Sequence, residues 1–416
     1  MVNDGADLGP IALKDAGADW QKFTFFQTFE CVKIRDITER AEVLVIRAES
    51  ESPGKEAKSE AAGSILTRNA LPKQPACMSK PKHFVGLDIG GSTIKAVIIG
   101  STGDQVGPIV EVKSFVKNGY EATFDQLDVA IGELCVHAGI TTEEIGGIGL
   151  DVPAPSSNGV IWGKANLGDD WVGTDICAKF KERTGIPVVM TNDCNAAAVG
   201  EYAIRNKHIG SLLLIAPGTG LGGGFVLPGG KLYEGTNGLA LEIGHISVPF
   251  TEEDGTLPAC TCGLKGCLEA WVSLVALRRR LSLELRKPVW EYHHLNTPES
   301  TIEEKAFQLR TLAESGDALA LQLFKEQGFK LGYGIADIVR TLDPGLVVLG
   351  GGLAEAKFRD QFLDWVKDGF TERAWSVYRH SPIEPEKITT HFEWAEGGDA
   401  AASIGMAYTA RELFSA

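Results

Sequence analysis

The stretch FVGLDIGGSTIKAVIIG, residues 84–100, decides the fold of this chain. It consists of an apolar run, a glycine turn and a second apolar run, and this pattern predicts a β-hairpin. The residues at the hairpin tip are Asp88, Gly90, Gly91, Ser92 and Thr93. Dinucleotide-binding folds open differently, with a strand, a glycine turn and a helix that leads to a parallel strand. The sequence therefore favours another kind of α/β fold.

The hairpin pattern returns in SLLLIAPGTGLGGGFVLPGGKLY, residues 211–233, and DPGLVVLGGGLAEA, residues 343–356, predicts a strand, a glycine turn and a helix. Segments with a helical spacing of apolar residues lie between and after these strands. They cover residues 124–138, 175–184, 195–205, 269–285, 302–315, 318–342 and 397–414. Two halves that each begin with a glycine-tipped hairpin predict a duplicated α/β unit around a cleft.

The composition indicates a globular protein with ordinary hydrophobic cores. The chain has 416 residues, of which 44% are hydrophobic, and a net charge of -15. Such a negative charge disfavours nucleic acid and anionic membranes as partners. Five of the eight cysteines are scattered without paired spacing, and the sequence shows neither a secretory signal nor an apolar run long enough to span a membrane. We therefore expect a reducing compartment, the cytoplasm.

Residues 1–82 differ in composition from the rest of the chain. The part from 39 to 75 is rich in Glu, Lys, Ser and Ala and shows no sustained periodicity. We expect weak or no order there. Because Met78 immediately precedes the first predicted strand, a further hypothesis is that translation starts at Met78. Mass spectrometry of the N-terminal peptide of the native protein tests it.

Three glycine turns follow predicted strands and are typical of phosphate-binding loops. Backbone N–H groups without neighbouring Cβ atoms can approach a polyphosphate closely. The residues concerned in the second and third turns are Gly218, Thr219, Gly220, Gly222, Gly350, Gly351 and Gly352. Tight turns without a ligand are the alternative. The GxGxxG pattern inside GTGLGGG leads into a strand, which argues against a dinucleotide site.

Two aspartates at strand ends are candidates for chemistry. Asp88 ends an apolar strand, where a carboxylate needs a partner, and Mg²⁺ would be one. Asp193 follows Asn192 between a predicted strand and a helix, so it has the position of a general base that accepts a proton from a substrate hydroxyl, while Asn192 orients that hydroxyl. The alternatives are an aspartate that fixes the turn and an aspartate that caps the helix.

The segment EIGHISVPFTEEDGTLPACTCGLKGCLE, residues 242–269, holds a candidate metal site. One nitrogen and three thiolates suit tetrahedral zinc, with a structural role because no coordination position stays open. The ligands would be His245, Cys260, Cys262 and Cys267. The alternative is three buried cysteines and a loop histidine. Zinc bound to one ring nitrogen of His245 leaves the other to donate a hydrogen bond, and Glu242 and Glu269 can accept, which predicts a polyol ligand.

These motifs together resemble the ROK (repressor, open reading frame, kinase) family of sugar kinases. The matching segments are FVGLDIGGSTIK, TNDCNAAAVGE, LIAPGTGLGGGF, LALEIGH with CTCGLKGCLE, LDPGLVVLGGG and GGDAAASIGMA, in the family's order. The resemblance implies a two-lobed, actin-like (ribonuclease H-like) α/β ATPase fold with a structural zinc loop. It also implies an N-terminal lobe over residues 83–193 completed by residues 398–416, and a C-terminal lobe over residues 194–397.

The resemblance further implies phosphoryl transfer from Mg-ATP to a hexose, with Asp193 as the base. The implied sugar contacts are Gly159, Asn166, Asn192, Asp193, Glu242, His245 and Glu269. The implied Mg-ATP site consists of Asp88, Lys95 and the three glycine turns. The first turn reads GGST where the family more often has GGTK, a form closer to kinases that use polyphosphate, and the loop from His245 to Cys260 is longer than usual.

Glucose is the favoured substrate in this interpretation. N-acetylmannosamine, N-acetylglucosamine, mannose and fructose are alternatives, because the sequence does not define the pocket around the sugar's second carbon. A sugar-responsive transcriptional repressor is the rival from another class, although residues 1–77 show no helix-turn-helix pattern. The family often forms homodimers or homotetramers, and we expect one of these here.

Overall fold

The computed structural model describes residues 30–34, 43–47, 83–163, 167–205 and 209–415. The chain divides into two compact units, Met1–Ala76 and Cys77–Ala416. In the first unit, strands β1 (Glu30–Ile34) and β2 (Val43–Arg47) pair in antiparallel fashion. The weak order expected over residues 1–82, and the proposed translation start, concern residues that lie mostly outside the described ranges and stay predictions.

The first sheet of the second unit has five strands in the order β5-β4-β3-β6-β9. Their bounds are β3 His83–Ile89, β4 Thr93–Gly100, β5 Val110–Lys113, β6 Ile145–Val152 and β9 Val188–Asn192. β3 and β4 form the expected antiparallel hairpin, and β6 and β9 continue the sheet in parallel. A small hairpin of β7 (Ser156–Ser157) and β8 (Val160–Ile161) follows β6.

The second sheet repeats this arrangement in the order β11-β10-β12-β13. Its strands are β10 Leu212–Pro217, β11 Leu221–Val226, β12 Leu346–Leu349 and β13 His391–Trp394. β10 and β11 form the second expected hairpin, and β12 and β13 add in parallel. A bridge from Val226 to Leu232 takes the place beyond β11 that β5 takes in the first sheet. The duplicated α/β unit predicted from the sequence is confirmed.

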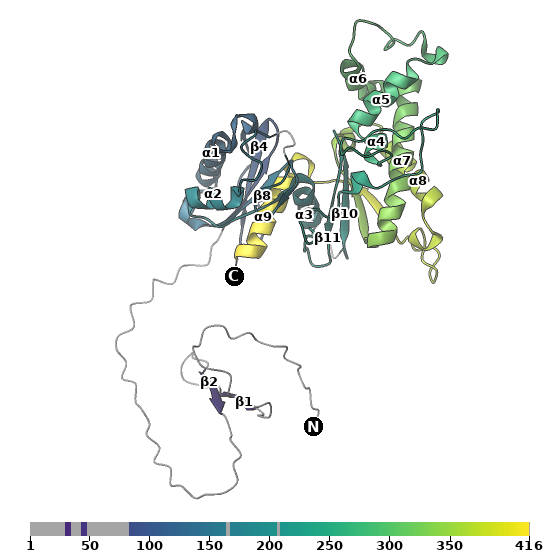
Figure 1. Cartoon of the computed structure of the whole chain (residues 1–416). Helices are drawn as coiled ribbons and strands as arrows, with labels where there is room; N and C mark the ends of the chain where they lie inside the picture. The colour runs from purple at the N-terminus through teal and green to yellow at the C-terminus, as the bar shows by residue number, and fades with distance from the viewer. Residues whose placement is uncertain (1–29, 35–42, 48–82, 164–166, 206–208, 416) are drawn as a thin grey trace, which may run out of the picture. The chain divides into compact units, whose positions relative to one another are not determined.

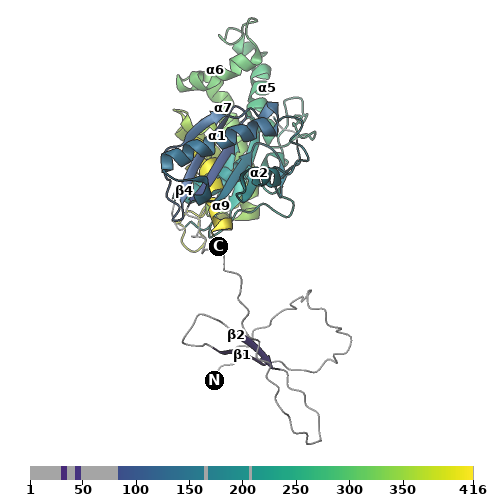
Figure 2. The same ribbon diagram turned by 90° about the vertical axis from the view of Figure 1, so that its left-hand side faces the viewer.

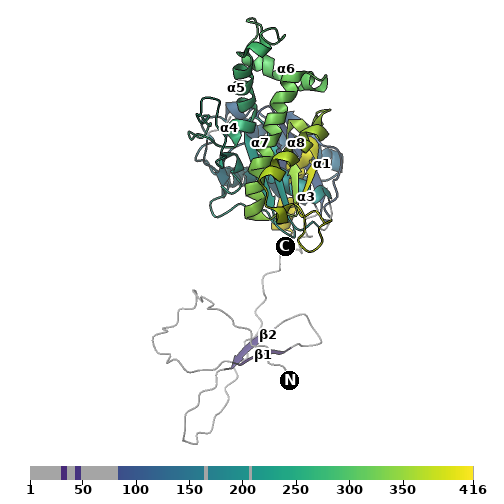
Figure 3. The same cartoon turned by 90° about the vertical axis from the view of Figure 1, so that its right-hand side faces the viewer.

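Helices cover the outer face of each sheet. α1 (Tyr120–Ala138) and α2 (Ile176–Thr184) lie over the first sheet (Figure 2), and α7 (Ala318–Leu342) and α8 (Arg359–Arg373) lie over the second (Figure 3). The buried face of α1 includes Phe124, Leu127, Ile131 and Leu134, which recur every three or four residues. This spacing forms the apolar stripe that packs on the sheet.

Two further helices, α3 (Asp193–Arg205) and α9 (Ala401–Phe414), pack against each other between the sheets (Figure 1). α9 lies against β3 and β6, while α3 lies against β10 and β11. The approach is close because the contact positions lack side chains: a Cβ added to Gly86 would lie 1.8 Å from the backbone oxygen of Ser403. One added to Gly200 would lie equally close to the oxygen of Ala401. These contacts bring the two halves of the unit together.

The structure differs from the sequence expectations mainly around residue 273. The helix expected over residues 269–285 is broken into α4 (Glu269–Val272) and α5 (Leu274–Glu284), because Ser273 is extended and its hydroxyl accepts the N–H of Ala276 as a helix cap. α6 covers Ile302–Glu314 as expected. Strands β1, β2, β5, β7, β8 and β13 and helix α8 were not expected. Within the described ranges, no helix combines the length and hydropathy that a membrane crossing requires.

Candidate functional site

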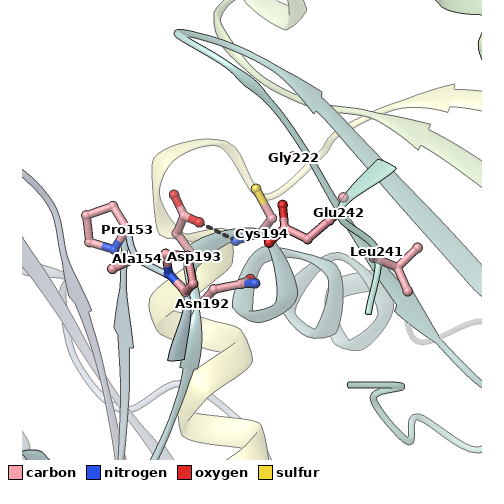
Figure 4. A pocket seen from close by; sticks show the side chains of 10 residues that line it. Pro153, Ala154, Asn192, Asp193, Cys194, Gly222, Leu241 and Glu242 are labelled. Atoms are coloured by element: carbon pink, nitrogen blue, oxygen red, sulfur yellow. Dashed lines mark hydrogen bonds between the residues drawn. The ribbon is translucent and has the colours of Figure 1, made fainter. Parts of the chain in front are cut away.

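A pocket of about 190 Å³ lies where the two sheets face each other across α3 (Figure 4). One wall comes from residues that follow β6 and β9, and the other from β11 and the segment before the cysteine cluster. The lining residues are Pro153, Ala154, Pro155, Asn192, Asp193, Cys194, Gly222, Gly223, Leu241 and Glu242. The pocket therefore contains three of the candidate sugar contacts: Asn192, Asp193 and Glu242.

Asn192 and Asp193 have different roles at the start of α3: Asn192 caps the helix and Asp193 lines the pocket. The Asn192 Oδ1 atom accepts the N–H of Asn195 at 2.7 Å, so Asn192 caps the helix. Asp193 Oδ1 accepts the adjacent N–H of Cys194 at 2.8 Å, and the Cys194 thiol also donates to this carboxylate. Because its neighbour provides the cap, the Asp193 carboxylate stays available to the pocket (Figure 4).

The environment of Asp193 favours proton acceptance. The side chain reaches solvent through the pocket, but protein surrounds it on the other sides, and this desolvation raises the pKa of Asp193. The hydrogen bond from Cys194 acts in the opposite direction and is the smaller effect. A carboxylate with a raised pKa is a stronger base than an ordinary aspartate, as general base catalysis requires.

Four polar side chains form one row across the first sheet. Asp88 on β3 is the register partner of Lys95 on β4 and of Asp151 on β6, and Asp151 is in turn the partner of Thr191 on β9. Lys95 Nζ lies 2.7 Å from Asp399 Oδ2, just before α9. Burial, followed by the nearby charge of Asp193, raises the pKa of Asp88, while its contact with Asp151 and the charge of Lys95 lower it.

Asp151 was not singled out by the sequence analysis. It is fully buried, and desolvation together with the adjacent Asp88 raises its pKa well above the ordinary value. The available signal was an aspartate inside the otherwise apolar strand IGGIGLDV, where a charged side chain needs a reason.

The second and third glycine turns meet at one edge of the second sheet. Gly351 follows β12 with φ 79°, and a Cβ on it would lie 2.3 Å from the backbone oxygen of Pro217, which precedes Gly218. Only glycine fits this contact. The first turn, closed by a bond from the Gly90 N–H to the Thr93 oxygen, belongs to the other sheet. The structure thus gives both lobes a glycine turn at the ends of their strands.

His245, Cys260, Cys262 and Cys267 come together as the sequence predicts, with all four ligand atoms within 4.8 Å of one another. The Cys260 Sγ to His245 Nδ1 distance is 3.5 Å, and the Cys262 Sγ to Cys267 Sγ distance is 3.7 Å. A tetrahedron with ordinary zinc bond lengths has N–S edges of about 3.5 Å and S–S edges of about 3.8 Å. The cluster therefore has the ligand set of a tetrahedral metal site, and these two distances match the edges of such a tetrahedron.

Backbone bonds hold this cluster against the pocket wall. The Leu268 N–H donates to the Ile246 oxygen at 2.8 Å, which joins the third cysteine to the segment of His245. His245 turns Nδ1 toward the thiols, so Nε2 lies on the opposite edge of its ring. Glu242 precedes this segment and reaches the pocket, and burial raises its pKa.

Glu269 has another environment. Its carboxylate is buried, Oε2 accepts the N–H of Leu221 at 2.9 Å, and Oε1 accepts the hydroxyl of Thr261 at 2.7 Å. Glu269 thus joins the cysteine loop to the first residue of β11. It is not among the pocket residues, and its role as a sugar contact stays a prediction.

The remaining candidates lie at the edge of the site or outside the described residues. Gly159 lies between β7 and β8 with φ 83°, packed against Cys177. Gly238, from the segment before Glu242, approaches this hairpin, since a Cβ on it would lie 2.8 Å from the Ser156 oxygen. Asn166 is outside the described residues.

A second group of possible metal ligands, His293, His294 and Asp317, is explained by hydrogen bonding. His293 Nδ1 accepts the N–H of Leu295 at 3.2 Å, which places the proton of the neutral ring on Nε2. That nitrogen lies 3.0 Å from Asp317 Oδ2 and donates to it. A protonated Nε2 has no lone pair for a metal, so this group forms a helix-cap network at the start of α7.

Comparison with known proteins places the chain among sugar-binding relatives. The sequence model of the ROK family matches residues 84–412. The chain is 32% identical to a glucokinase of Halalkalibacterium halodurans over 70% of its length and 85% of the relative. It is 33% identical to an N-acetylmannosamine kinase of Escherichia coli over 65% and 84%. A xylose repressor of Bacillus subtilis is 27% identical over 67% and 66%.

Solved structures give the same grouping. A ROK hexokinase from Thermus thermophilus matches with a TM-score of 0.62 and 29% identity, over 80% of this chain and 99% of the other. A ROK family glucokinase from Streptomyces griseus, in complex with glucose and AMPPNP, matches with a TM-score of 0.60 and 28% identity, over 79% and 99%.

Proposed function

The chain belongs to the ROK family, and on that premise we propose that it is a hexose kinase that transfers the γ-phosphoryl group of ATP to glucose. The fold expected from the sequence, the two-lobed actin-like ATPase fold of ROK kinases, is confirmed by the same membership. Glucose is the proposed substrate because glucokinases of several organisms are among the relatives and the Streptomyces griseus relative binds glucose with an ATP analogue; the N-acetylmannosamine kinase, at 33% identity, makes that sugar the alternative.

One observation carries the proposal: Asp193 faces the pocket between the lobes while Asn192 caps α3 in its place. In a protein that only bound a sugar, Asp193 would accept a hydrogen bond from a hydroxyl, and a raised pKa would bring no advantage. In a kinase, it accepts the proton of the attacking hydroxyl during in-line transfer of the phosphoryl group.

The other residues of the site support this reaction. The glycine turns offer backbone N–H groups to the phosphates of ATP, and a Mg²⁺ ion near Asp88 would neutralise phosphate charge. Asn192 retains its Nδ2 donor and Glu242 its acceptors for sugar hydroxyls. We keep His245, Glu269, Gly159 and Asn166 as proposed further contacts.

We propose that zinc occupies the Cys₃His cluster and has a structural role. All four positions of a tetrahedral ion are taken by protein atoms, so none remains for a substrate or a reactive water. Zinc on the Nδ1 atom of His245 fixes the ring so that Nε2 can donate to a sugar oxygen. The metal thus positions a sugar contact.

The decisive experiment measures turnover of glucose, mannose, fructose, N-acetylmannosamine and N-acetylglucosamine with either ATP or polyphosphate as donor. We expect the highest kcat/KM for glucose with ATP. A preference for an acetylated amino sugar would assign the chain to the activity of its Escherichia coli relative, and a preference for polyphosphate would correct the donor.

The rival function, a sugar-responsive repressor, is favoured by the likeness to the Bacillus subtilis xylose repressor. Binding to promoter DNA, measured on the same preparation, separates the two functions. DNA binding that responds to a sugar without any phosphorylation would refute the kinase proposal.

Our further proposals are a cytoplasmic location, a homodimer or homotetramer, and hexose and Mg-ATP as the only partners, without nucleic acid or membrane.

A further inference from the structure

The buried aspartate beside Asp88 requires an explanation that the kinase mechanism above does not give. Asp151 has no exposed surface, and among the described residues its carboxyl group has one partner, the side chain of Asp88, to which it donates a hydrogen bond when it carries a proton. Once both groups are ionised, two adjacent carboxylates in the protein interior repel each other, at a cost on the order of several kcal/mol unless a cation compensates them. Such a pair persists where another species completes its environment.

The neighbours in the sheet do not supply this partner. Lys95, one strand beyond Asp88, is paired with Asp399. Thr191, on the other side, donates its hydroxyl proton to Glu234 Oε1 at 2.7 Å and accepts from Asn195 Nδ2 at 3.2 Å. Asp88 and Asp151 are thus left as two adjacent carboxylates on one face of the sheet, at the carboxyl ends of parallel strands.

We propose that Asp88 and Asp151 together bind a divalent cation, with Asp151 as its buried ligand. The inference rests on the proposed kinase function, since it names the second protein ligand of the cation that accompanies ATP. Mg²⁺ is commonly held by one or two carboxylates and completes its shell with water and phosphate oxygens. Asp88 on β3 and Asp151 on the adjacent β6 would be these two carboxylates. The first glycine turn begins two residues after Asp88, so a nucleotide phosphate bound there would lie near the cation.

The position of Asp151 also determines what the cation does to the site. The ligand lies on a rigid central strand that packs on α9, and it cannot move into solvent. The cation is therefore held at a fixed place, with Asp193 near enough for its charge to raise the pKa of both carboxyl groups. A positive charge there favours the ionised forms of all three carboxyl groups.

The test is direct binding of Mn²⁺ to the full chain, followed by electron paramagnetic resonance without sugar, first alone and then with ADP. We expect one protein site that Mg²⁺ competes for, and at least tenfold weaker binding in Asp151→Asn. Asp88→Asn should weaken binding as much, and the double variant little further. Asp104→Asn, which removes a carboxylate in the turn after β4, is the matched control and should bind as the wild type does.

Thermal unfolding provides a second measurement that does not depend on activity. Mg²⁺ should raise the Tm of the wild type and of Asp104→Asn, and at the same concentration raise that of Asp151→Asn much less, and circular dichroism checks that each variant is folded. Wild-type Mn²⁺ affinity in folded Asp151→Asn would overturn the proposal, and the pair would then share a proton, which the Asn amide replaces. Absence of turnover on every hexose, with Mn²⁺ binding as predicted, would instead contradict only the kinase function.

Discussion

The two sheets of the Cys77–Ala416 unit have the same topology but end in different chemistry. Each begins with an antiparallel hairpin and continues with two parallel strands. The strands of the first sheet end at three aspartates, Asp88, Asp151 and Asp193, whereas the strands β10 and β12 of the second end at glycines. The two sheets therefore share a topology but present different functional groups at their strand ends.

The difference indicates a division of labour between the lobes. Carboxylates bind cations and accept protons, while glycine turns present N–H groups to anions. A reaction that moves a proton from a sugar and a phosphoryl group from a nucleotide needs both kinds of surface across one cleft. If the comparison is right, a change at Asp193 should affect the chemical step, and changes in the glycine turns of the second sheet should affect nucleotide binding.

The largest expected effect comes from Asp193→Asn. The variant keeps an oxygen for the N–H of Cys194 but loses the proton acceptor, so kcat should fall by about 10²–10⁴-fold. The affinity for ADP, measured by calorimetry, should stay unchanged.

Asp175→Asn is the matched control for this variant. Asp175 also begins a helix and accepts a backbone N–H, that of Ala178, at 2.8 Å, but it lies outside the pocket. Its kcat should remain within about twofold, because a cap contributes about 1 kcal/mol to stability and nothing to the chemical step. Near-normal turnover in Asp193→Asn would contradict the role of Asp193 as the general base.

The second prediction concerns the glycine lobe. Gly351→Ala forces a Cβ into a residue with positive φ and against the Pro217 oxygen, at a cost of about 1–3 kcal/mol. We expect KM for ATP to rise by about tenfold, which corresponds to ~1.4 kcal/mol, with little change in KM for glucose. Steady-state kinetics with each substrate varied measures this.

Gly352→Ala is its control, because a Cβ there meets no atom within 4 Å and φ is not in the left-handed region. Both variants add a methyl group to the same turn, so both test the approach of the nucleotide, and only Gly351→Ala also introduces strain against the Pro217 oxygen. An equal rise in KM for ATP in both would mean that this strain plays no part in nucleotide binding.

The glycine turns and aspartates compared above differ in how well the sequence alone predicts them. The hairpins and glycine turns were predicted because their signals are local. Asp151 was not, since its meaning comes from the pairing of β3 with β6, a long-range contact that a strand pattern does not specify. The bonds of Glu269 to Leu221 and Thr261 depend in the same way on how the cysteine loop folds back on β11.

The third prediction tests whether the metal loop serves the sugar pocket. Cys262→Ser removes one thiolate, so bound zinc should be lost in metal analysis and Tm should fall. If zinc orients His245 toward the sugar, KM for glucose should also rise by about fivefold, the equivalent of one lost hydrogen bond at ~1 kcal/mol. Cys135→Ser, a buried cysteine of α1 outside the cluster, should leave zinc content and KM unchanged. An unchanged KM in folded Cys262→Ser would limit the metal to structural support.

The smallest effect is expected from a change of pH near neutrality. Lower pH should protonate Asp193 in the first lobe but leave the glycine turns of the second lobe unchanged. Burial raises the pKa of Asp193 above 3.8, and a base works only when it is deprotonated. Therefore kcat/KM for glucose should be nearly constant at neutral pH and decrease by about tenfold per unit once the pH is below this raised pKa. Backbone N–H groups do not titrate, so the affinity for ADP, measured without a divalent cation, should stay constant until the nucleotide phosphate itself takes up a proton near pH ~6. Pre-steady-state rates and ADP titrations over the same pH series distinguish the two profiles. A decrease of both with one common pKa would show that Asp193 also controls nucleotide binding, and the division between the lobes would fail.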